Sequence, residues 1–324
     1  MIKNYLKVAW RNLMKNKIFS LINILGLTLG FTSCFLISLY IQHEISYDKY
    51  HQNSKRIYRL ATHIQGSTYG EGIAKIAAPW APAAKQEIPE IEEFTRFMRY
   101  GQALIKQGAE QIYDEEGFFA DSTVFKVFSW KFNNGNASTA LNEPNSVVLT
   151  ESFAHKLFKE VNPVGKTLNI DNEPVFKVTG VIQDPPPNSH FDFSFLVSLS
   201  TYKNDDLHSW TNYQFYTYLL LKPGASSEAV AKKLGNLLTT NLKEEAKAHT
   251  PFLQLLTDIH LHSNLFREIT PNSDVTTIYI VGIIALIILF IACMNFVNLT
   301  TAKAANRAKE VGIRKASGAK KSNL

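Results

Sequence analysis

Three groups of polar residues in this sequence have spacings that could serve catalysis or ligand binding. The first is the stretch Val164-Gly165-Lys166-Thr167, which ends like a phosphate-binding loop. The complete pattern requires a glycine five positions before Gly165, but Glu160 stands there. We therefore interpret Gly165 as a turn residue, and the sequence shows no ATP-binding loop.

The second group is a His-x-His pair, His260 and His262, which could act as metal ligands. On a β-strand the two rings would point to the same face, as zinc ligands can, and Asp258 lies two residues earlier. No further ligand follows at a characteristic spacing, so the sequence favours two half-exposed strand histidines. Neither a metal nor a cofactor is predicted.

The third group is acidic and lacks the nucleophile that an acid–base site would need. Asp205, Asp206 and His208 are best explained as part of a polar loop. Asp192, between two phenylalanines, fits the solvent-facing position of an alternating strand. The sequence therefore predicts no enzyme in the region that carries these residues.

The elements that position these residues follow from two long uncharged stretches. Phe19–Ile41 has 23 residues and Thr277–Thr300 has 24, without a charged side chain in either. At about 1.5 Å per residue, each helix could cross a hydrocarbon core of about 30 Å. We expect residues 19–41 and 277–300 to be transmembrane helices and residues 42–276 to form a domain between them. The first stretch is too long for a cleaved signal peptide, whose apolar region has about 7–15 residues.

The net charge of +6 is divided unevenly along the chain. Residues 1–18 carry +5 and residues 301–324 carry +6, whereas the remainder carries −5. Basic residues beside a span favour the cytoplasmic side of a membrane. We therefore expect both termini in the cytoplasm and residues 42–276 outside. The basic composition reflects this orientation, and nucleic acid is not an expected partner.

Each end of the chain has a pattern of its own. In residues 1–18 a basic side chain recurs every four positions opposite an apolar face, which predicts an amphipathic helix on the lipid surface. Gly26 and Gly30 form Gly-x-x-x-Gly, a spacing that lets another helix approach closely. Residues 301–324 combine small residues with the favourably ordered pair Glu310 and Arg314, which predicts a helix that docks on a protein in the cytoplasm.

The central region has the pattern of an α+β domain, because strands and helices follow one another without regular alternation. Strands are predicted at residues 56–65, 95–106, 111–119, 146–149, 167–170, 175–182, 191–199, 213–222 and 253–261. Helices are predicted at residues 79–93, 151–159 and 226–248, the last with Ser226 or Ser227 as its N-cap.

Motifs at both ends resemble those of the MacB/FtsX-like ABC transporter permeases. They are Tyr5–Leu13 (YLKVAWRNL), Leu25–Gly30 (LGLTLG) and Asn306–Ala319 (NRAKEVGIRKASGA). The resemblance implies a bacterial inner-membrane protein with a MacB-like periplasmic core domain at residues 42–276. It also implies that residues 301–324 begin an FtsX-like permease domain and couple to an ATPase. The coupling residues would be Arg307, Lys309, Glu310, Gly312, Ile313, Arg314, Lys315 and Gly318.

The resemblance further implies a subunit that is not itself an enzyme and that works with partners. These are a separate ABC ATPase subunit, a second permease copy or second half, the lipid bilayer and a periplasmic adaptor. The ATPase would drive export or efflux of a peptide, antibiotic, toxin or lipoprotein-like cargo. Because such permeases have at least four spans and this chain has two, we expect an N-terminal fragment or the first half of a longer protein.

Three alternatives are compatible with the same pattern. One is an FtsX-like regulator of cell-wall hydrolases, and another is a membrane-anchored binding or structural protein. The third is a two-span sensor with an external ligand-binding domain and a cytoplasmic signalling helix. The sensor is less favoured because Gly312 and Gly318 would weaken a long signalling helix.

Overall fold

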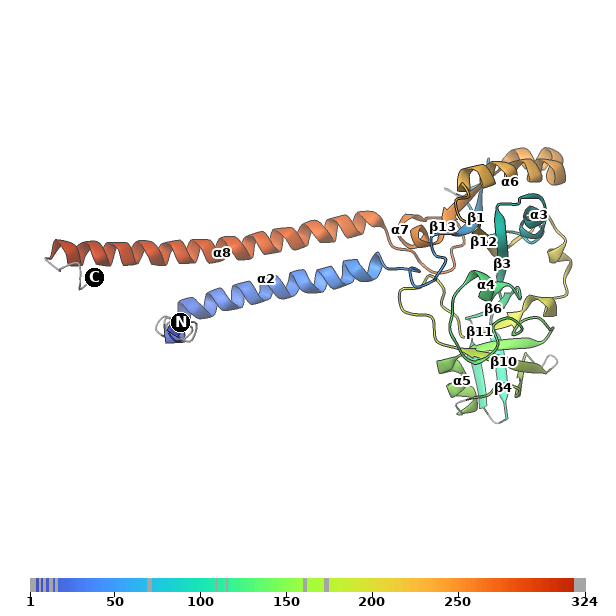
Figure 1. Cartoon of the computed structure of the whole chain (residues 1–324), viewed down its shortest axis with the longest axis horizontal. Coiled ribbons are helices and arrows are strands. Elements are labelled where there is room, and N and C mark those ends of the chain that lie inside the picture. The colour runs from blue at the N-terminus through green and yellow to red at the C-terminus, as the bar shows by residue number, and fades with distance from the viewer. Residues whose placement is uncertain are drawn as a thin grey trace. The chain divides into compact units, whose positions relative to one another are not determined.

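The computed structural model of the chain divides into two compact units (Figure 1). One contains residues 1–45 and 275–324, and the other contains residues 46–274. The structure describes residues 4, 5, 7, 10, 11, 14, 17–68, 72–108, 110–114, 116–159, 162–171 and 175–317. Most of the predicted amphipathic helix at residues 1–18 lies outside this set.

The terminal unit is built from two long helices, α2 (Lys17–Glu44) and α8 (Val275–Ala316). They contain the two uncharged stretches, and both are long and apolar enough to cross a membrane. Large apolar side chains stay exposed along them, among them Phe35 at 64% and Phe290 at 65%. Large apolar side chains exposed along a helix are typical of a lipid-facing surface, because their exposure to water is unfavourable.

The central unit is built on a single mixed sheet, which has 13 strands within the described residues. Its main path runs β13-β1-β12-β3-β6-β11-β8-β10-β9-β4-β5, while β2 pairs with β12 and β7 with β10. Neighbouring strands are antiparallel except for β8 with β10 and β6 with β11. The strands are β1 (Ile57–Ile64), β2 (Ile76–Ala77), β3 (Ile91–Arg99), β4 (Ala103–Gln107), β5 (Glu110–Asp114), β6 (Gly117–Ala120), β7 (Phe132–Gly135), β8 (Ser146–Thr150), β9 (Thr167–Ile170), β10 (Phe176–Ile182), β11 (Phe195–Ser198), β12 (Tyr213–Leu221) and β13 (His249–Leu255).

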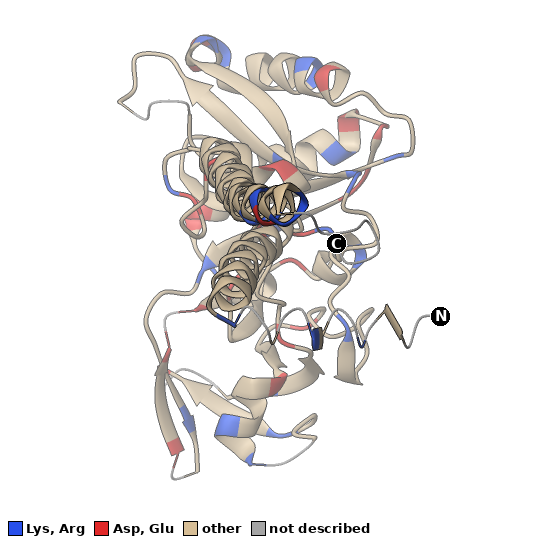
Figure 2. Cartoon of the chain, turned by 90° about the vertical axis from the view of Figure 1, so that its left-hand side faces the viewer, with Lys and Arg blue, Asp and Glu red and all other residues tan. Residues whose placement is uncertain are grey.

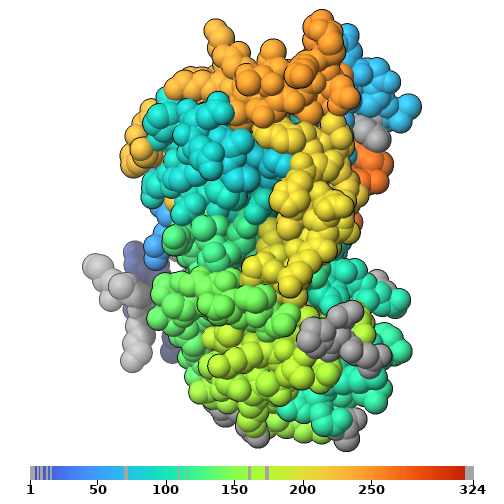
Figure 3. Space-filling model, turned by 90° about the vertical axis from the view of Figure 1, so that its right-hand side faces the viewer, coloured from blue at the N-terminus to red at the C-terminus, as the bar shows by residue number. Residues whose placement is uncertain are grey.

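Short helices cover this sheet, and they are α3 (Trp80–Glu87), α4 (Val124–Val127), α5 (Glu151–Phe158), α6 (Ser227–Leu242) and α7 (Ile259–His262). Short 3-10 turns occupy Leu199–Thr201, Asp205–Leu207, Lys243–Ala248 and Leu256–Asp258. In Figure 3 α6, coloured orange, lies along one end of the unit, and the green and yellow-green segments around α5 and β10 form the opposite end. The α+β architecture predicted from the sequence is therefore confirmed.

The core is rich in aromatic rings that meet edge to face. Phe97 on β3 is fully buried, and the ring centroids of five aromatic neighbours lie within 6.4 Å of its own. These neighbours are Phe118, Phe128, Trp130, Phe191 and Tyr218. Such pairs add about 0.5–1.5 kcal/mol each to the burial of their area, so this cluster fixes the centre of the sheet.

Most predicted elements of the central unit are confirmed, but the helix predicted at residues 79–93 is too long. The helix α3 ends at Glu87 and β3 begins at Ile91. Ile88 precedes Pro89, and its backbone is extended, with φ −114° and ψ 97°. A residue before proline disfavours the helical conformation, and this ends the helix.

Four predicted strands also differ from the structure. The strand at 111–119 corresponds to two strands, β5 and β6, which lie apart in the sheet. The strand at 95–106 is divided into β3 and β4 at Gly101, whose φ of +92° turns the chain. The strand at 191–199 is reduced to β11, and Phe191 and Phe193 are buried without strand pairing. The strand at 253–261 ends at Leu255, and a 3-10 turn and α7 follow.

Candidate functional site

The two long helices pack against each other through small residues. A Cβ placed on Gly30 would lie 2.6 Å from the Cβ of Ala292, and one on Gly26 would lie 3.1 Å from Nδ2 of Asn295. Glycine at both positions therefore allows an approach that a larger residue would prevent. The contacts pair later residues of α2 with earlier residues of α8, so the two helices run antiparallel.

Polar groups also lie in this helix pair. The thiol of Cys34 donates to the carbonyl oxygen of Ala285 at 3.2 Å. Asn23 is 8% exposed, and its Oδ1 accepts no hydrogen bond from the residues that the structure describes. At the other end, the ammonium group of Lys303 lies 4.9 Å from the ring centroid of Phe19, a cation–π contact. These groups stand along the interface between the two helices.

The segment predicted to couple to an ATPase forms the C-terminal part of α8. Its side chains at 307, 309, 310 and 312–315 are exposed, and Glu310 and Arg314 form an ion pair one turn apart. Ile313 is 60% exposed beside them. Lys and Arg colour this end of the helix blue in Figure 2. Gly318 lies outside the described residues, and the helix continues through Gly312 without a break.

In the central unit, a buried polar network joins the chain segment after α2 to the segment before α8. Asp48 and His190 are 0% and 2% exposed, and Asp48 Oδ2 lies 2.9 Å from Nδ1 of His190. The other ring nitrogen of His190 lies 2.7 Å from the hydroxyl of Tyr218 on β12. Thr270 donates to the carbonyl oxygen of His190 at 3.1 Å. Burial raises the pKa of Tyr218 far above its usual value, so its hydroxyl stays protonated.

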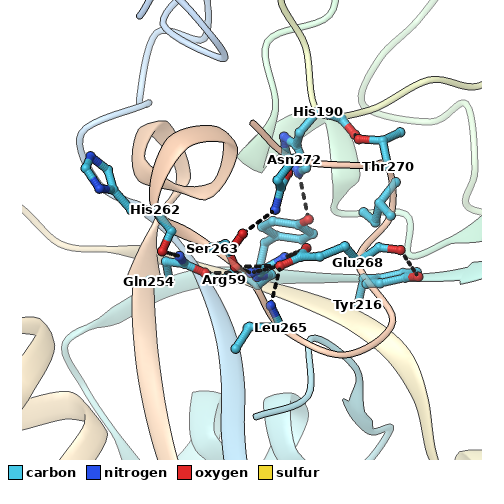
Figure 4. A network of polar contacts seen from close by, with 12 residues as sticks. Arg59, His190, Tyr216, Gln254, His262, Ser263, Leu265, Glu268, Thr270 and Asn272 are labelled. Atoms are coloured by element: carbon cyan, nitrogen blue, oxygen red, sulfur yellow. Dashed lines mark hydrogen bonds and ion pairs between the residues drawn. The ribbon is translucent and has the colours of Figure 1, made fainter. Parts of the chain in front are cut away.

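A second part of the network surrounds Arg59, a fully buried residue of β1 (Figure 4). Its guanidinium forms a bidentate ion pair with Glu268 and donates to Gln254 at 2.5 Å and to Ser263 at 2.7 Å. Glu268 also accepts from Ser263 and, at 3.3 Å, from the backbone N–H of Leu265. A buried ion pair is stable only with such supporting hydrogen bonds.

Each part of the network holds one of the segments that flank the long helices against the sheet. Asp48 follows the end of α2 by four residues, and Thr270 precedes the start of α8 by five. Both segments are tied to the neighbouring strands β1 and β12 by buried hydrogen bonds. A displacement of either segment would therefore be transmitted to β1 and β12, the second and third strands from one end of the sheet.

An aromatic cluster supports the segment after α2. His51 is 2% exposed, and its Nδ1 accepts from the backbone N–H of Ser129 at 3.0 Å. Burial lowers the pKa of His51 to about 3, so the ring is neutral. The hydroxyl of Tyr50 lies 3.0 Å from Oγ of Ser189 and accepts from the indole of Trp130 at 3.2 Å. These contacts fix residues 48–51 on the core.

The structure corrects the interpretation of His260 and His262. Both lie on the short helix α7, where residues two apart point in different directions, and not on a strand. His260 is buried and its ring stacks on Tyr47, whereas His262 is exposed. The described residues contain no group of three or more His, Cys, Asp or Glu that could hold a metal ion.

The other polar motifs have structural explanations. Gly165 has φ +90° and lies in the predicted turn before β9. Asp206 accepts from the hydroxyl of Tyr202 and the amide of Asn212, which stabilises the predicted polar loop. Asp192 is exposed, as predicted, and lines a cleft of about 470 Å³ with other carboxylates.

The polar network was not predicted from the sequence. Arg59 and Glu268 are 209 residues apart, and Asp48 and His190 are 142 residues apart. No local pattern connects them. The one available signal was a charged residue, Arg59, at a position that β1 buries among apolar neighbours such as Leu60 and Ala61.

Comparison with known proteins agrees with this architecture. A domain of a putative permease from Porphyromonas gingivalis has a similar fold, with a TM-score of 0.56 and 22% identity over 68% of this chain and 95% of that one. Among curated relatives, the pyoverdine export ATP-binding/permease protein PvdT of Pseudomonas syringae pv. syringae is 24% identical over 348 residues. The macrolide export ATP-binding/permease protein MacB of Salmonella paratyphi A is 22% identical over 348 residues.

The two alignments with PvdT and MacB each cover 98% of this chain but only 47% and 48% of the relatives, so the chain spans about half of their length. Residues 20–237 match the family of MacB-like periplasmic core domains. This range includes most of α2 and the central unit as far as α6. The chain belongs to the family defined by the MacB-like periplasmic core domain, whose relatives are ABC transporter permeases.

Proposed function

We propose that this chain is the permease part of a MacB-type ABC transporter in a bacterial inner membrane. In this proposal α2 and α8 cross the membrane, both ends of the chain are cytoplasmic and residues 46–274 are periplasmic. The family match, the two exposed apolar helices and the basic residues at both ends support this arrangement. ATP hydrolysis takes place on a nucleotide-binding subunit or domain outside this chain.

The observation that carries the proposal is the buried network between the segments that flank the helices. ATP-driven movement of α8 reaches Thr270 and Glu268, and movement of α2 reaches Asp48. Because these residues are bonded to β12, β1 and His190, a movement that reaches them is passed on to the strands of the central unit. A loosely tethered domain would absorb such a movement in its linkers.

The names of two relatives support the proposed cargo class. PvdT and MacB are described as export proteins for pyoverdine and for macrolides. We propose export or efflux of a comparable cargo by this chain, in the class of peptides, antibiotics, toxins or lipoproteins. A second permease copy or half and a periplasmic adaptor complete the assembly.

Co-expression with a MacB-type ABC ATPase subunit tests the proposal. Reversing the exposed pair with Glu310→Lys and Arg314→Glu is expected to reduce co-purification of the ATPase at least several-fold, because the docking surface changes its charge pattern. The matched control reverses another exposed pair, Glu244 and Lys247 in the central unit, and should leave co-purification unchanged. Equal recovery of the ATPase with both reversed pairs would exclude this segment as the coupling surface.

A further inference from the structure

Three chain segments bring three cationic side chains together in the central unit. Ile73 and Phe266 form a parallel bridge, with hydrogen bonds from Ala74 N to Phe266 O at 3.0 Å and from Phe266 N to Gly72 O at 2.8 Å. This pairing places Lys75 close to Arg267. Arg99, the last residue of β3, donates to the carbonyl oxygen of Ile269 on the same loop.

Aromatic rings, not carboxylates, lie against these cations. The ammonium of Lys75 is 5.1 Å from the ring centroid of Tyr216, and the guanidinium of Arg99 is 5.1 Å from that of Phe118. Arg267 lies 5.4 Å from the ring of Phe266. Within the described part of the chain none of the three cations forms an ion pair, and the nearby Glu268 is already paired with Arg59.

The described residues compensate only part of the charge in this cluster, because Arg99 interacts electrostatically with Glu116 but forms no ion pair with it. Burial and, after it, the positive charges of Arg267 and Arg99 together lower the pKa of Lys75 to about 8. Arg267 is exposed and has a left-handed backbone with φ +61°, an uncommon conformation for a residue with a side chain. An anion bound between the three groups would relieve their mutual repulsion.

We propose that Lys75, Arg99 and Arg267 bind the phosphate of an anionic phospholipid headgroup. This rests on the proposed function, in which α8 crosses the membrane. Arg267 precedes Val275, the first residue of α8, by eight positions, and eight extended residues span at most about 28 Å. Phe266 is 43% exposed beside the cations, and an aromatic ring among basic residues is typical of the membrane interface.

Chemical labelling of lysines in the full chain tests this site. The chain is placed in nanodiscs of phosphatidylcholine, with or without phosphatidylglycerol, and treated at pH 8 with an amine-acylating reagent. Phosphatidylglycerol should slow acylation of Lys75 at least threefold, because a bound phosphate favours the unreactive ammonium. Exposed Lys49, five residues after α2, is the control for the general effect of a negatively charged membrane surface. Its acylation rate should change less than that of Lys75.

Variants and a soluble anion distinguish the outcomes. Arg267→Gln should abolish the additional protection of Lys75, whereas Lys177→Gln, a change at an exposed position on β10, should preserve it. Equal protection of Lys75 and Lys49, or unchanged protection in Arg267→Gln, would overturn the proposal. Protection by inorganic phosphate in pure phosphatidylcholine discs would also overturn it, because the site would then select a soluble anion. Failure here with intact ATPase co-purification would leave the proposed function standing.

Discussion

The guanidinium of Arg59 donates four side-chain hydrogen bonds to residues at least 195 positions away, and all of them are buried or half-buried. It joins β1 to Gln254 on β13 and to Ser263 and Glu268 in the loop before α8. A charge in this position is tolerated only while its partner carboxylate is present. The pair therefore fixes the loop on the sheet.

Glu268→Ala is expected to lower the free energy of unfolding of the central unit by about 3–5 kcal/mol, because Arg59 would be left charged and buried. Thermal unfolding of the full chain in detergent, followed by near-UV circular dichroism, measures this. The control is Glu92→Ala, which removes the half-exposed partner of Arg56 and should cost about 1 kcal/mol or less. Equal losses in the two variants would contradict the assigned role of the Arg59 pair.

His51 makes the stability of the central unit depend on pH. Its folded-state pKa of about 3 lies below the ordinary value of 6.5, so the unfolded chain takes up a proton first as the pH falls. The stabilisation is complete above pH 6.5 and decreases as the pH falls towards 3, by about 1.4 kcal/mol per pH unit. Unfolding midpoints measured between pH 7 and 4 should therefore fall less steeply for His51→Gln than for the unaltered chain. The same change at exposed His155 should not alter the slope.

At the residue scale, the sequence predicted those features that depend only on neighbouring residues, such as a helix cap. The side chain of Ser226 caps α6 by accepting from the backbone N–H of Ala229, as its position before a helical pattern indicated. The partners of Arg59 and of Asp48 could not be predicted in this way, because they meet only after the sheet has formed.

At the scale of elements, the helix pair α2 and α8 depends on two glycines. Gly30→Val should destabilise the pair, because its Cβ would have to lie 2.6 Å from that of Ala292. Adding Ala292→Gly should restore much of the loss. Gly282→Ala is the control, since its new Cβ would meet only Ile41 at 3.8 Å. Thermal loss of the far-UV helical signal in detergent checks this, and a failure of Ala292→Gly to rescue Gly30→Val would contradict the packing.

The length of α8 bears on the choice between a permease and a two-span sensor. The helix has 42 residues and continues through Gly312, so this glycine does not end it as a weak helix former could. The argument from glycine against a signalling helix is therefore weakened, and it is the family match that favours a permease over a sensor. Most element types were predictable from periodicity, although the helix α7 lies where the end of a strand was predicted. Boundaries failed where a proline or glycine acted locally, as at Pro89 and Gly101.

At the scale of the whole molecule, the division of charge is the property that connects sequence and function. Both ends are basic, the central part is acidic, and the structure separates the same parts into a helix pair and a central unit. In the proposed function, this division orients the chain so that the coupling segment and the periplasmic domain lie on opposite sides of the membrane.

Labelling of single cysteines with a membrane-impermeant maleimide tests that central claim most directly. In a chain carrying Cys34→Ser and Cys293→Ser, one cysteine is placed at exposed Ser138 of the central unit or at exposed Ser317 at the end of α8. The account predicts that the cysteine at 138 is labelled in intact spheroplasts and that the cysteine at 317 is labelled only after the membrane is permeabilised. Equal labelling of both positions in intact spheroplasts, or the reverse order, would contradict it.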